Sequence, residues 1–269
     1  MSDRLPPPPD PPTQAAQTPA EVTQGGATPA PAGLVPPGMF RVDLHCHSEA
    51  SADCRTPVRE FPTRCAARGI AVQAITDHDQ IWGAQLLQEL CADNPALTVI
   101  VGEEISTRDG EIIGLFLRER VPPGLSAEET VANIRAQGGL VLIPHAFDPL
   151  KRFHIHPQAL EHIADQVDIV ETFNSHISSP RWNLRALEWA ESRGKLKSAG
   201  SDAHTLDRIG AAWVQAPARD VRTPDDLRQT LLEGTVMGEW KHPFVAYASK
   251  LWDFVRRAGS GRTLEAPRP

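Results

Sequence analysis

The sequence predicts an α/β fold whose strands close, or nearly close, into a barrel, and three observations support this. Apolar runs suited to buried parallel strands alternate along the chain with helical segments. About seven such units follow one another, which favours a barrel over an open doubly wound sheet. Histidine and carboxylate side chains stand at the carboxyl ends of the strands, where barrels of this kind carry their sites.

The first strand is predicted within residues 41–48, where apolar and polar residues alternate. Alternation with a period of two is typical of a strand. One face carries Asp43, His45 and His47, and the other carries Val42, Leu44 and Cys46. The imidazoles of His45 and His47 then point the same way and could bind one metal ion or two adjacent ions. The alternative is a half-buried strand with ordinary polar residues.

The later strands are predicted wherever a short apolar run ends at polar residues. They are expected at 70–76, 97–102, 111–117, 140–143, 167–171, 197–199 and 210–215. The helices between them are expected at 57–68, 82–92, 126–137, 157–164, 180–193 and 223–233. Pro57 starts the first helix and Gly69 ends it. Ser126 and Glu129 form a capping box, and Thr223 caps the last of these helices.

The chain divides into three predicted segments. Residues 1–38 are rich in Pro, Ala, Thr and Gln and have almost no large apolar groups, so they are expected to form a disordered tail. The barrel occupies residues 39–238. Residues 239–269 are a second tail with an amphipathic helix at 244–257. We expect this helix to pack against the barrel; a partner or membrane surface is the alternative.

Composition excludes several classes of protein. A net charge of −7 over 269 residues argues against a general nucleic-acid surface. The four cysteines form no CxxC pair, so reduced thiols in a cytoplasmic protein are expected. The chain starts without an apolar signal region, and no later run is long enough to cross a membrane. It has no glycine-rich phosphate loop, dinucleotide fingerprint or Gly-x-Ser-x-Gly elbow.

The polar residues at the strand ends have ordinary explanations when taken singly. Residues 77–79 could cap a helix, Glu104 could be a solvated carboxylate, and His145 could be a satisfied core histidine. Their joint occurrence at consecutive strand ends, with Asp202 and His204, is hard to explain in that way. Mixed imidazole and carboxylate ligands suit Zn²⁺, Mn²⁺ or Fe²⁺ better than Ca²⁺. Several carboxylates among the histidines allow two or three ions, which activate water in phosphoryl displacement.

These residues stand in motifs that resemble those of the PHP family, named for polymerase and histidinol phosphatase. The motifs are Asp43-Leu-His-Cys-His-Ser, Ile75-Thr-Asp-His-Asp, Gly102-Glu-Glu-Ile-Ser, Pro144-His145 and Gly200-Ser-Asp-Ala-His. The resemblance covers about residues 40–216. Within the family, the chain is most similar to a stand-alone group of short PHP-type phosphoesterases without a polymerase domain. The resemblance implies a distorted seven-stranded (β/α) barrel, up to three metals, and hydrolysis of phosphate esters.

The resemblance also implies a ligand set and catalytic residues. The matching positions are His45, His47, Asp53, His78, Glu104, His145, Asp202 and His204. It selects Glu104 rather than Glu103 as the bridging glutamate, a choice that spacing alone leaves open. The implied cofactors are two or three divalent ions of Mn, Zn or Fe, with Mg as a further option.

Glu111 marks a departure from the family pattern. Many relatives carry a histidine three residues before the glycine of Gly-Leu-Phe, where this chain has Glu111. A carboxylate would still bind a metal through oxygen, and we expect Glu111 to be a ligand. The replacement would make the site harder and more anionic, so the identity of a third metal stays open.

A phosphate substrate needs cations in addition to the metals. Arg152, a few residues after His145, is the first expectation, and Lys151, Arg181 and Arg208 are the second. His176 could orient the substrate or donate a proton to the leaving oxygen. Each of these residues could instead be an ordinary loop or surface residue.

The leading hypothesis is a metal-dependent phosphoesterase that uses metal-activated water. Its expected substrate is a small phosphate ester, with a nucleotide or nucleoside 3′,5′-bisphosphate as candidates. Nucleic acid is expected only as a short oligonucleotide substrate. One alternative is an amidohydrolase-type enzyme that cleaves a C–N bond, but the bridging lysine carbamate of many such sites has no lysine at the relevant strand ends. The other is a non-catalytic, metal-stabilised interaction module.

Overall fold

The computed structural model describes residues 35–151 and 153–240. The predicted N-terminal tail as far as residue 34, Arg152, and the predicted helix at 244–257 lie outside the described residues. The strands are β1 (Met39–Asp43), β2 (Ile70–Ile75), β3 (Thr98–Thr107), β4 (Gly110–Leu115), β5 (Leu140–Ile143), β6 (Ile169–Asn174), β7 (Leu196–Gly200), β8 (Ala212–Pro217) and β9 (Thr235–Gly238). The α-helices are α1 (Phe61–Arg68), α2 (Trp82–Leu90), α3 (Ala127–Ala136), α4 (Pro157–Ile163), α5 (Pro180–Ser192) and α6 (Pro224–Glu233).

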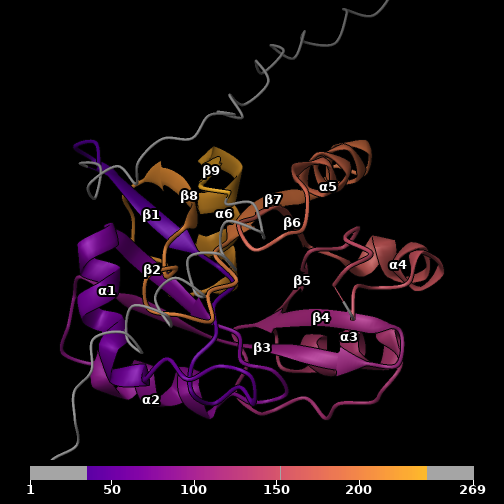
Figure 1. Ribbon diagram of the computed structural model, residues 1–269, viewed down its shortest axis with the longest axis horizontal. Coiled ribbons are helices and arrows are strands. Elements are labelled where there is room, and N and C mark those ends of the chain that lie inside the picture. The colour runs from indigo at the N-terminus through magenta and orange to yellow at the C-terminus, as the bar shows by residue number, and fades with distance from the viewer. Residues whose placement is uncertain (1–34, 152, 241–269) are drawn as a thin grey trace, which may run out of the picture.

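The strands form one curved sheet that nearly closes on itself (Figure 1). Their order is β7-β6-β5-β4-β3-β2-β1-β8-β9. Just beyond β1, the Leu44 N–H donates to the carbonyl of Ala199 in β7 at 3.3 Å, and the Asp202 N–H donates to the carbonyl of His45 at 2.8 Å. These bonds draw the two distant parts of the sheet order together, so the predicted barrel class is confirmed.

The barrel is distorted because not all its strands are parallel. β4 runs antiparallel to both β3 and β5, and β8 runs antiparallel to β1 and β9. The turn from Thr107 to Gly110 is too short for a crossover, so β3 and β4 must form a hairpin. The expectation of parallel strands throughout was therefore wrong for β4 and β8, and β9 was not predicted.

The helix boundaries follow the local signals in the sequence. Gly69 ends α1 with a left-handed φ of 67°. Ser126 and Thr223 both form complete capping boxes, at the starts of α3 and α6. The helix expected from Pro57 begins as a short 3-10 turn, η1 (Val58–Glu60), before α1 continues it.

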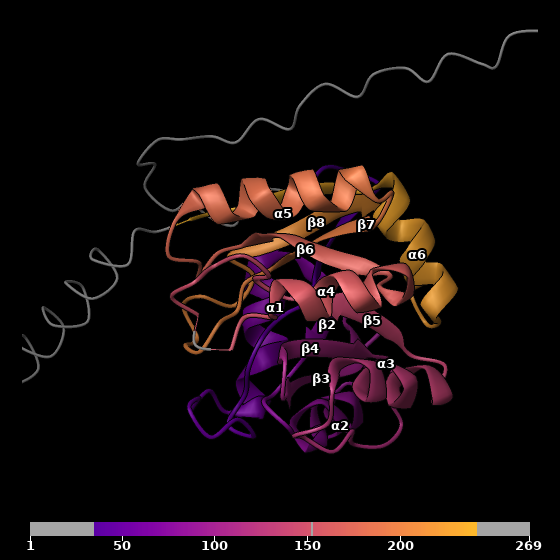
Figure 2. The same ribbon diagram turned by 90° about the vertical axis from the view of Figure 1, so that its right-hand side faces the viewer.

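Two apolar cores hold the fold together. The inner core fills the barrel with residues such as Val42, Leu44 and Leu142, and Leu227 of α6 also belongs to it. The outer core lies between the sheet and the helices, which surround the strands (Figure 2). Cys46 belongs to this outer core, so its expected placement on one face with Val42 and Leu44 was wrong; the alternation reaches Leu44, one residue beyond the end of β1, and no further.

Within the described residues, no helix has both the length and the apolar character needed to cross a membrane. All four cysteines are buried and unpaired.

Candidate metal centre

Histidine and carboxylate side chains from separate strands meet at one end of the barrel. His45 and His47 follow β1, His78 follows β2, Glu104 lies in β3, Glu111 lies in β4, His145 follows β5, and Asp202 and His204 follow β7. These are the carboxyl ends of the parallel strands, and β4 contributes from its amino end because it runs the opposite way. The structure thus brings together the strand-end residues that the sequence singled out.

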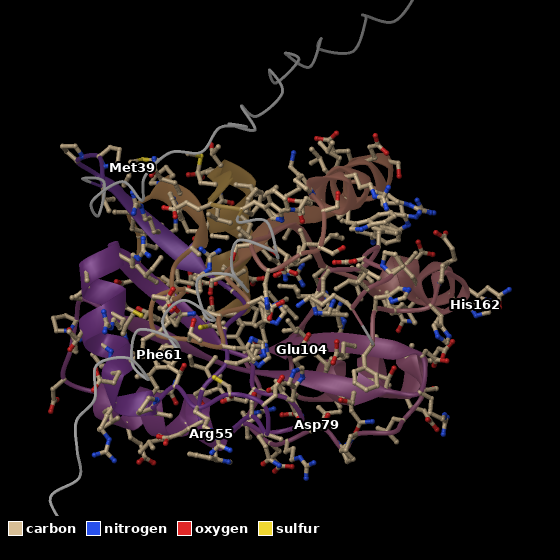
Figure 3. All side chains as sticks on the ribbon, viewed as in Figure 1. Met39, Arg55, Phe61, Asp79, Glu104 and His162 are labelled. Atoms are coloured by element: carbon tan, nitrogen blue, oxygen red, sulfur yellow. The ribbon has the colours of Figure 1, made fainter. Side chains whose placement is uncertain are left out.

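Glu104 lies at the centre of this cluster (Figure 3). Its Oε2 is 3.3 Å from Nε2 of His45, from Nε2 of His47 and from Nδ1 of His78. Its Oε1 is 3.0 Å from Nε2 of His145. Burial alone would raise the pKa of this carboxyl, but the surrounding imidazoles hold the pKa well below its ordinary value. A carboxylate that faces ligands on both oxygens suits a bridging position.

Glu103 faces a different part of the molecule. Its Oε2 accepts a hydrogen bond from the Val121 N–H at 2.7 Å, and burial raises its pKa to about 7. Neighbouring residues in a strand point to opposite faces. The geometry therefore agrees with the choice of Glu104 over Glu103.

Asp202 lies on the other side of His45 and His47. Its Oδ1 is 3.5 Å from Nε2 of His47 and 3.8 Å from Nε2 of His45. The backbone at Asp202 has a φ of +49°, and that at His145 has a φ of +27°. Non-glycine residues rarely adopt such angles, and they cluster at functional sites.

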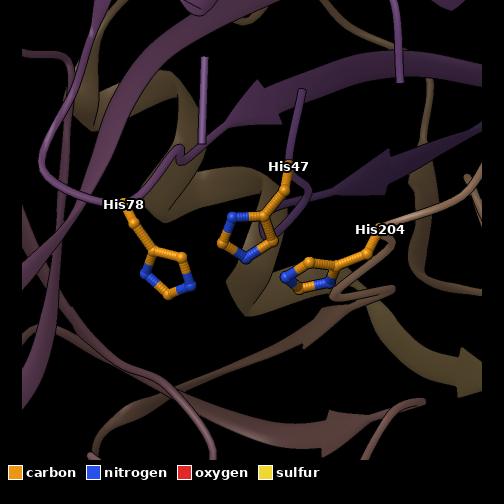
Figure 4. Close-up of side chains that lie close together, drawn as sticks. All are labelled: His47, His78 and His204. Atoms are coloured by element: carbon orange, nitrogen blue, oxygen red, sulfur yellow. The ribbon is translucent and has the colours of Figure 1, made fainter. Parts of the chain in front are cut away.

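The rings of His47, His78 and His204 lie side by side (Figure 4). The ring centroids of His47 and His204 are 4.2 Å apart. Asp53 closes this group from the loop after β1, with its Oδ2 3.2 Å from Nε2 of His204 and 3.6 Å from Nε2 of His78. Hydrogen bonds from these two histidines lower the pKa of Asp53, although its side chain is half exposed.

Glu111 joins the cluster from β4 and is 5% exposed. Its Oε1 is 3.6 Å from Nδ1 of His78, and its Oε2 is 3.7 Å from Nε2 of His145. Burial and the nearby Glu104 carboxylate raise its pKa to about 9. If Glu111 merely began a strand, its side chain would lie in water. It is buried instead.

Two buried carboxylates outside the predicted ligand set orient the histidines. Glu171 Oε1 lies 3.0 Å from Nδ1 of His45, which leaves Nε2 of His45 facing Glu104. Asp77 accepts a hydrogen bond from the Ser51 hydroxyl at 2.9 Å, and this hydroxyl is 3.0 Å from Nδ1 of His47. Carboxylate and hydroxyl partners of this kind fix the tautomer and direction of metal-binding imidazoles.

The residues expected near the substrate divide into three groups. Arg152 lies outside the described residues. His176 reaches the edge of the cluster, with Nδ1 3.9 Å from Oδ2 of Asp202 and a side chain that is 60% exposed. Lys151 enters from the loop after β5 and donates to the same Asp202 oxygen. Arg208 instead donates to the Ser175 hydroxyl and Arg181 stacks over Trp182, so neither contacts the cluster.

The donor set fits divalent metal ions. Among the residues that the structure describes, five groups of three each bring ligand atoms within 4.8 Å of one another. The groups are His47–His78–His204, His45–His47–Glu104, His45–His145–Asp202, His176–Asp202–His204 and His78–Glu104–Glu111. The buried Nδ1 of His145 has no hydrogen-bond partner among the described residues. Imidazoles mixed with carboxylates are the ligands of Zn²⁺, Mn²⁺ and Fe²⁺, and buried carboxylates this close repel one another without a cation.

Comparison with known proteins identifies two family models in the chain. The model of the PHP domain matches residues 43–165, and the model described as PHP-associated matches residues 180–236. An uncharacterised protein of Methanocaldococcus jannaschii is 35% identical over 193 residues, which are 70% of this chain and 75% of the relative. A 5′-3′ exoribonuclease of Haemophilus influenzae is 32% identical over 123 residues, 41% of this chain and 44% of the relative.

The fold has counterparts among solved structures. A two-domain protein of Bacteroides vulgatus, described as containing a predicted PHP-like metal-dependent phosphoesterase, superposes with a TM-score of 0.60 at 14% identity. The match covers 75% of this chain and 65% of that protein. At this level of identity the likeness concerns the fold alone.

Proposed function

The chain belongs to the PHP family, and on that premise we propose that it is a metal-dependent phosphoesterase that hydrolyses a small phosphate ester. The observation that carries the proposal is the convergence of four imidazoles on Glu104 from three strand ends. Such a set of ligands supports two or three ions of Mn, Zn or Fe, with Mg as a further option.

The proposed ligands are the residues of the cluster. They are His45, His47, Asp53, His78, Glu104, Glu111, His145, Asp202 and His204. Bound ions would activate water and neutralise charge on the phosphate. The chain prepares the rings for this role, because Glu171 and Ser51 occupy the Nδ1 atoms of His45 and His47 and direct both Nε2 atoms toward Glu104.

His176 is the proposed proton donor to the leaving oxygen. Its imidazole is largely exposed and lies at the edge of the cluster, close to Asp202. A leaving alkoxide needs a proton, and an imidazole near neutral pH can supply one. Arg152 follows Lys151 in the sequence and stays a proposed contact of the phosphate.

The proposed substrate class is a small phosphomonoester, such as a nucleotide or nucleoside 3′,5′-bisphosphate. The Haemophilus relative is named a 5′-3′ exoribonuclease, so short oligonucleotides belong among the candidates. An amidohydrolase reaction has less support because the side chain at the centre of the imidazoles is Glu104 and not a lysine that could carry a bridging carbamate.

The test is phosphate release by pure protein, measured beside its metal content. Substrates should include nucleotides, sugar phosphates, 3′,5′-bisphosphates and short oligoribonucleotides. We expect release that stops after dialysis against a chelator and returns with Mn²⁺ or Zn²⁺. Chelation that removes the metal but leaves release unchanged would exclude the proposed chemistry. Metal-dependent amide hydrolysis without phosphate release would favour the amidohydrolase alternative.

A further inference from the structure

The two carboxylate oxygens of Asp202 face different surroundings. Oδ1 faces the imidazoles of His45, His47 and His204, at 3.8, 3.5 and 3.6 Å. Oδ2 faces the Lys151 ammonium and the Asn174 amide, the latter at 3.1 Å, and the exposed ring of His176 lies 3.9 Å from it. Asp202 therefore lies between the histidine cluster and a small cationic patch formed by Lys151 and Asn174.

Lys151 is the charged group of that patch. An ammonium has three hydrogen-bond donors, and Asp202 takes one of them. The Lys151 side chain is 21% exposed and lies at the edge of the cluster, between Asp202 and the outside of the barrel. The Asn174 amide differs, because its donors already bond Glu171 and Asp202. Within the described residues Asp202 is the acceptor that Lys151 bonds, so Lys151 keeps donors for an incoming anion.

The loop that carries Lys151 is anchored at both ends. The Asp148 carboxylate accepts hydrogen bonds from the Ser178 hydroxyl at 2.6 Å and the Ser178 N–H at 2.7 Å. This ties the loop after β5 to the loop after β6, which carries His176. Further on, the Phe153 carbonyl accepts from the Glu111 N–H at 2.7 Å. A lysine whose loop is anchored and whose ammonium is already paired with Asp202 loses little side-chain entropy when it binds an anion.

We propose that Lys151 binds a non-bridging oxygen of the substrate phosphate, between Asp202 and solvent. The inference rests on the proposed phosphoesterase function and names the residue that recognises its phosphate. The Lys151 ammonium would donate one hydrogen bond to Asp202 and another to the phosphate. Asp148 is the corresponding positioning residue, since it holds the loop without touching the cluster.

The experiment compares Lys151→Met with Lys197→Met. Methionine keeps an unbranched stem and removes the charge; Lys197 pairs with Glu191 on the surface and is a matched control. Calorimetric titration of the metal-loaded protein with inorganic phosphate should give a Kd about tenfold or more higher for Lys151→Met, the effect of losing a charge-assisted hydrogen bond. Metal content should not change, KM should rise more than kcat falls, and Lys151→Arg should restore part of the affinity.

A second measurement needs no variant. Acetylation of the wild-type protein, read by mass spectrometry, should be slowed at Lys151 by inorganic phosphate and not at Lys197. An unchanged phosphate Kd in Lys151→Met, with tighter metal binding, would mean that Lys151 is only a counter-ion for Asp202 and would overturn the inference. If Lys151→Met fails to fold, equal acetylation of Lys151 with and without phosphate overturns it.

The two proposals fail in different ways. Phosphate release by the wild-type protein with an unchanged phosphate Kd in Lys151→Met rejects the role of Lys151 and keeps the phosphoesterase. Weakened phosphate binding in Lys151→Met, with no ester hydrolysed by the wild-type protein, keeps the phosphate subsite and rejects the enzyme.

Discussion

Glu103 and Glu104 are neighbours in β3 whose side chains lie on opposite faces of the strand. They are therefore a matched pair for mutation. Glu104 contacts imidazoles, whereas Glu103 accepts from a backbone N–H. We expect Glu104→Gln to lower metal content and to reduce phosphate release by orders of magnitude, because an amide is a poorer ligand than a carboxylate. Glu103→Gln should keep both. Metal analysis and a release assay of the two variants check this, and equal metal loss in both would contradict it.

Glu111 gives the second prediction at the residue scale. If its carboxylate is a ligand, Glu111→Ala should lose one class of bound metal and much of the activity, because the methyl group leaves no oxygen at this position beside His78 and His145. Glu111→His should keep the metal stoichiometry and shift the preference toward softer ions such as Zn²⁺. Metal competition measured by mass spectrometry distinguishes the two variants. Full metal content and turnover in Glu111→Ala would leave a two-metal enzyme.

Residue spacing predicts which side chains meet only when each stands at the end of its own strand. That condition holds for His45, His78 and His145. It does not hold for Glu171, which contacts His45 from inside β6 and not from beyond the end of the strand. The available signal for Glu171 was a carboxylate directly after the apolar residues Ile169 and Val170. Spacing also left Glu103 and Glu104 unresolved, and only the family resemblance chose between them.

At the scale of an element, the end of β7 has to pass very close to the cluster. A Cβ on Gly200 would overlap the Glu171 carboxylate and the Cβ of His45. We therefore expect Gly200→Ala to displace Glu171, to release the fixed orientation of His45 and to weaken metal binding about tenfold or more, as losing a partner of a ligand does. Calorimetric metal titration measures this.

Gly138→Ala is a control for the cost of losing a glycine, because among the described residues, its two chain neighbours aside, no atom lies within 4 Å of a Cβ built there. Its positive φ of 77° makes alanine unfavourable, so it should lower the melting temperature. It should leave metal affinity unchanged. Wild-type metal affinity in Gly200→Ala would show that β7 can move away without disturbing the site.

The apolar runs predict where strands lie but not which way they run. β4 has the buried residues of a parallel strand, and all six of its residues are buried. Its direction is decided by the short turn before it, which leaves no room for a helix. β9 gives a weak pattern because its residues alternate between exposed and partly exposed. Direction and edge strands therefore need information about neighbours that a single run lacks.

At the scale of the whole molecule, β1 runs from the opposite end of the barrel to the metal centre. It pairs with β2 on one side and β8 on the other, and His45 follows its last residue by two positions. The residues just before β1 are also tied down. The Ala218 N–H donates to the Gly38 carbonyl at 2.8 Å, and the Met39 N–H donates to the Pro36 carbonyl at 3.0 Å. The position of His45 thus depends on contacts made at the start of the strand.

This dependence predicts different results for two truncations that differ by four residues. Removal of residues 1–34 should leave melting temperature and metal content unchanged, because that segment has few apolar side chains to bury. Removal of residues 1–38 should lower the melting temperature, because it also removes Val35, which packs at Gly69, and the carbonyl that binds Ala218. Thermal denaturation and metal analysis of both proteins test this. A large fall in melting temperature for the shorter deletion would mean that the tail packs on the barrel, and equal stability of both would mean that β1 needs no anchor before Met39.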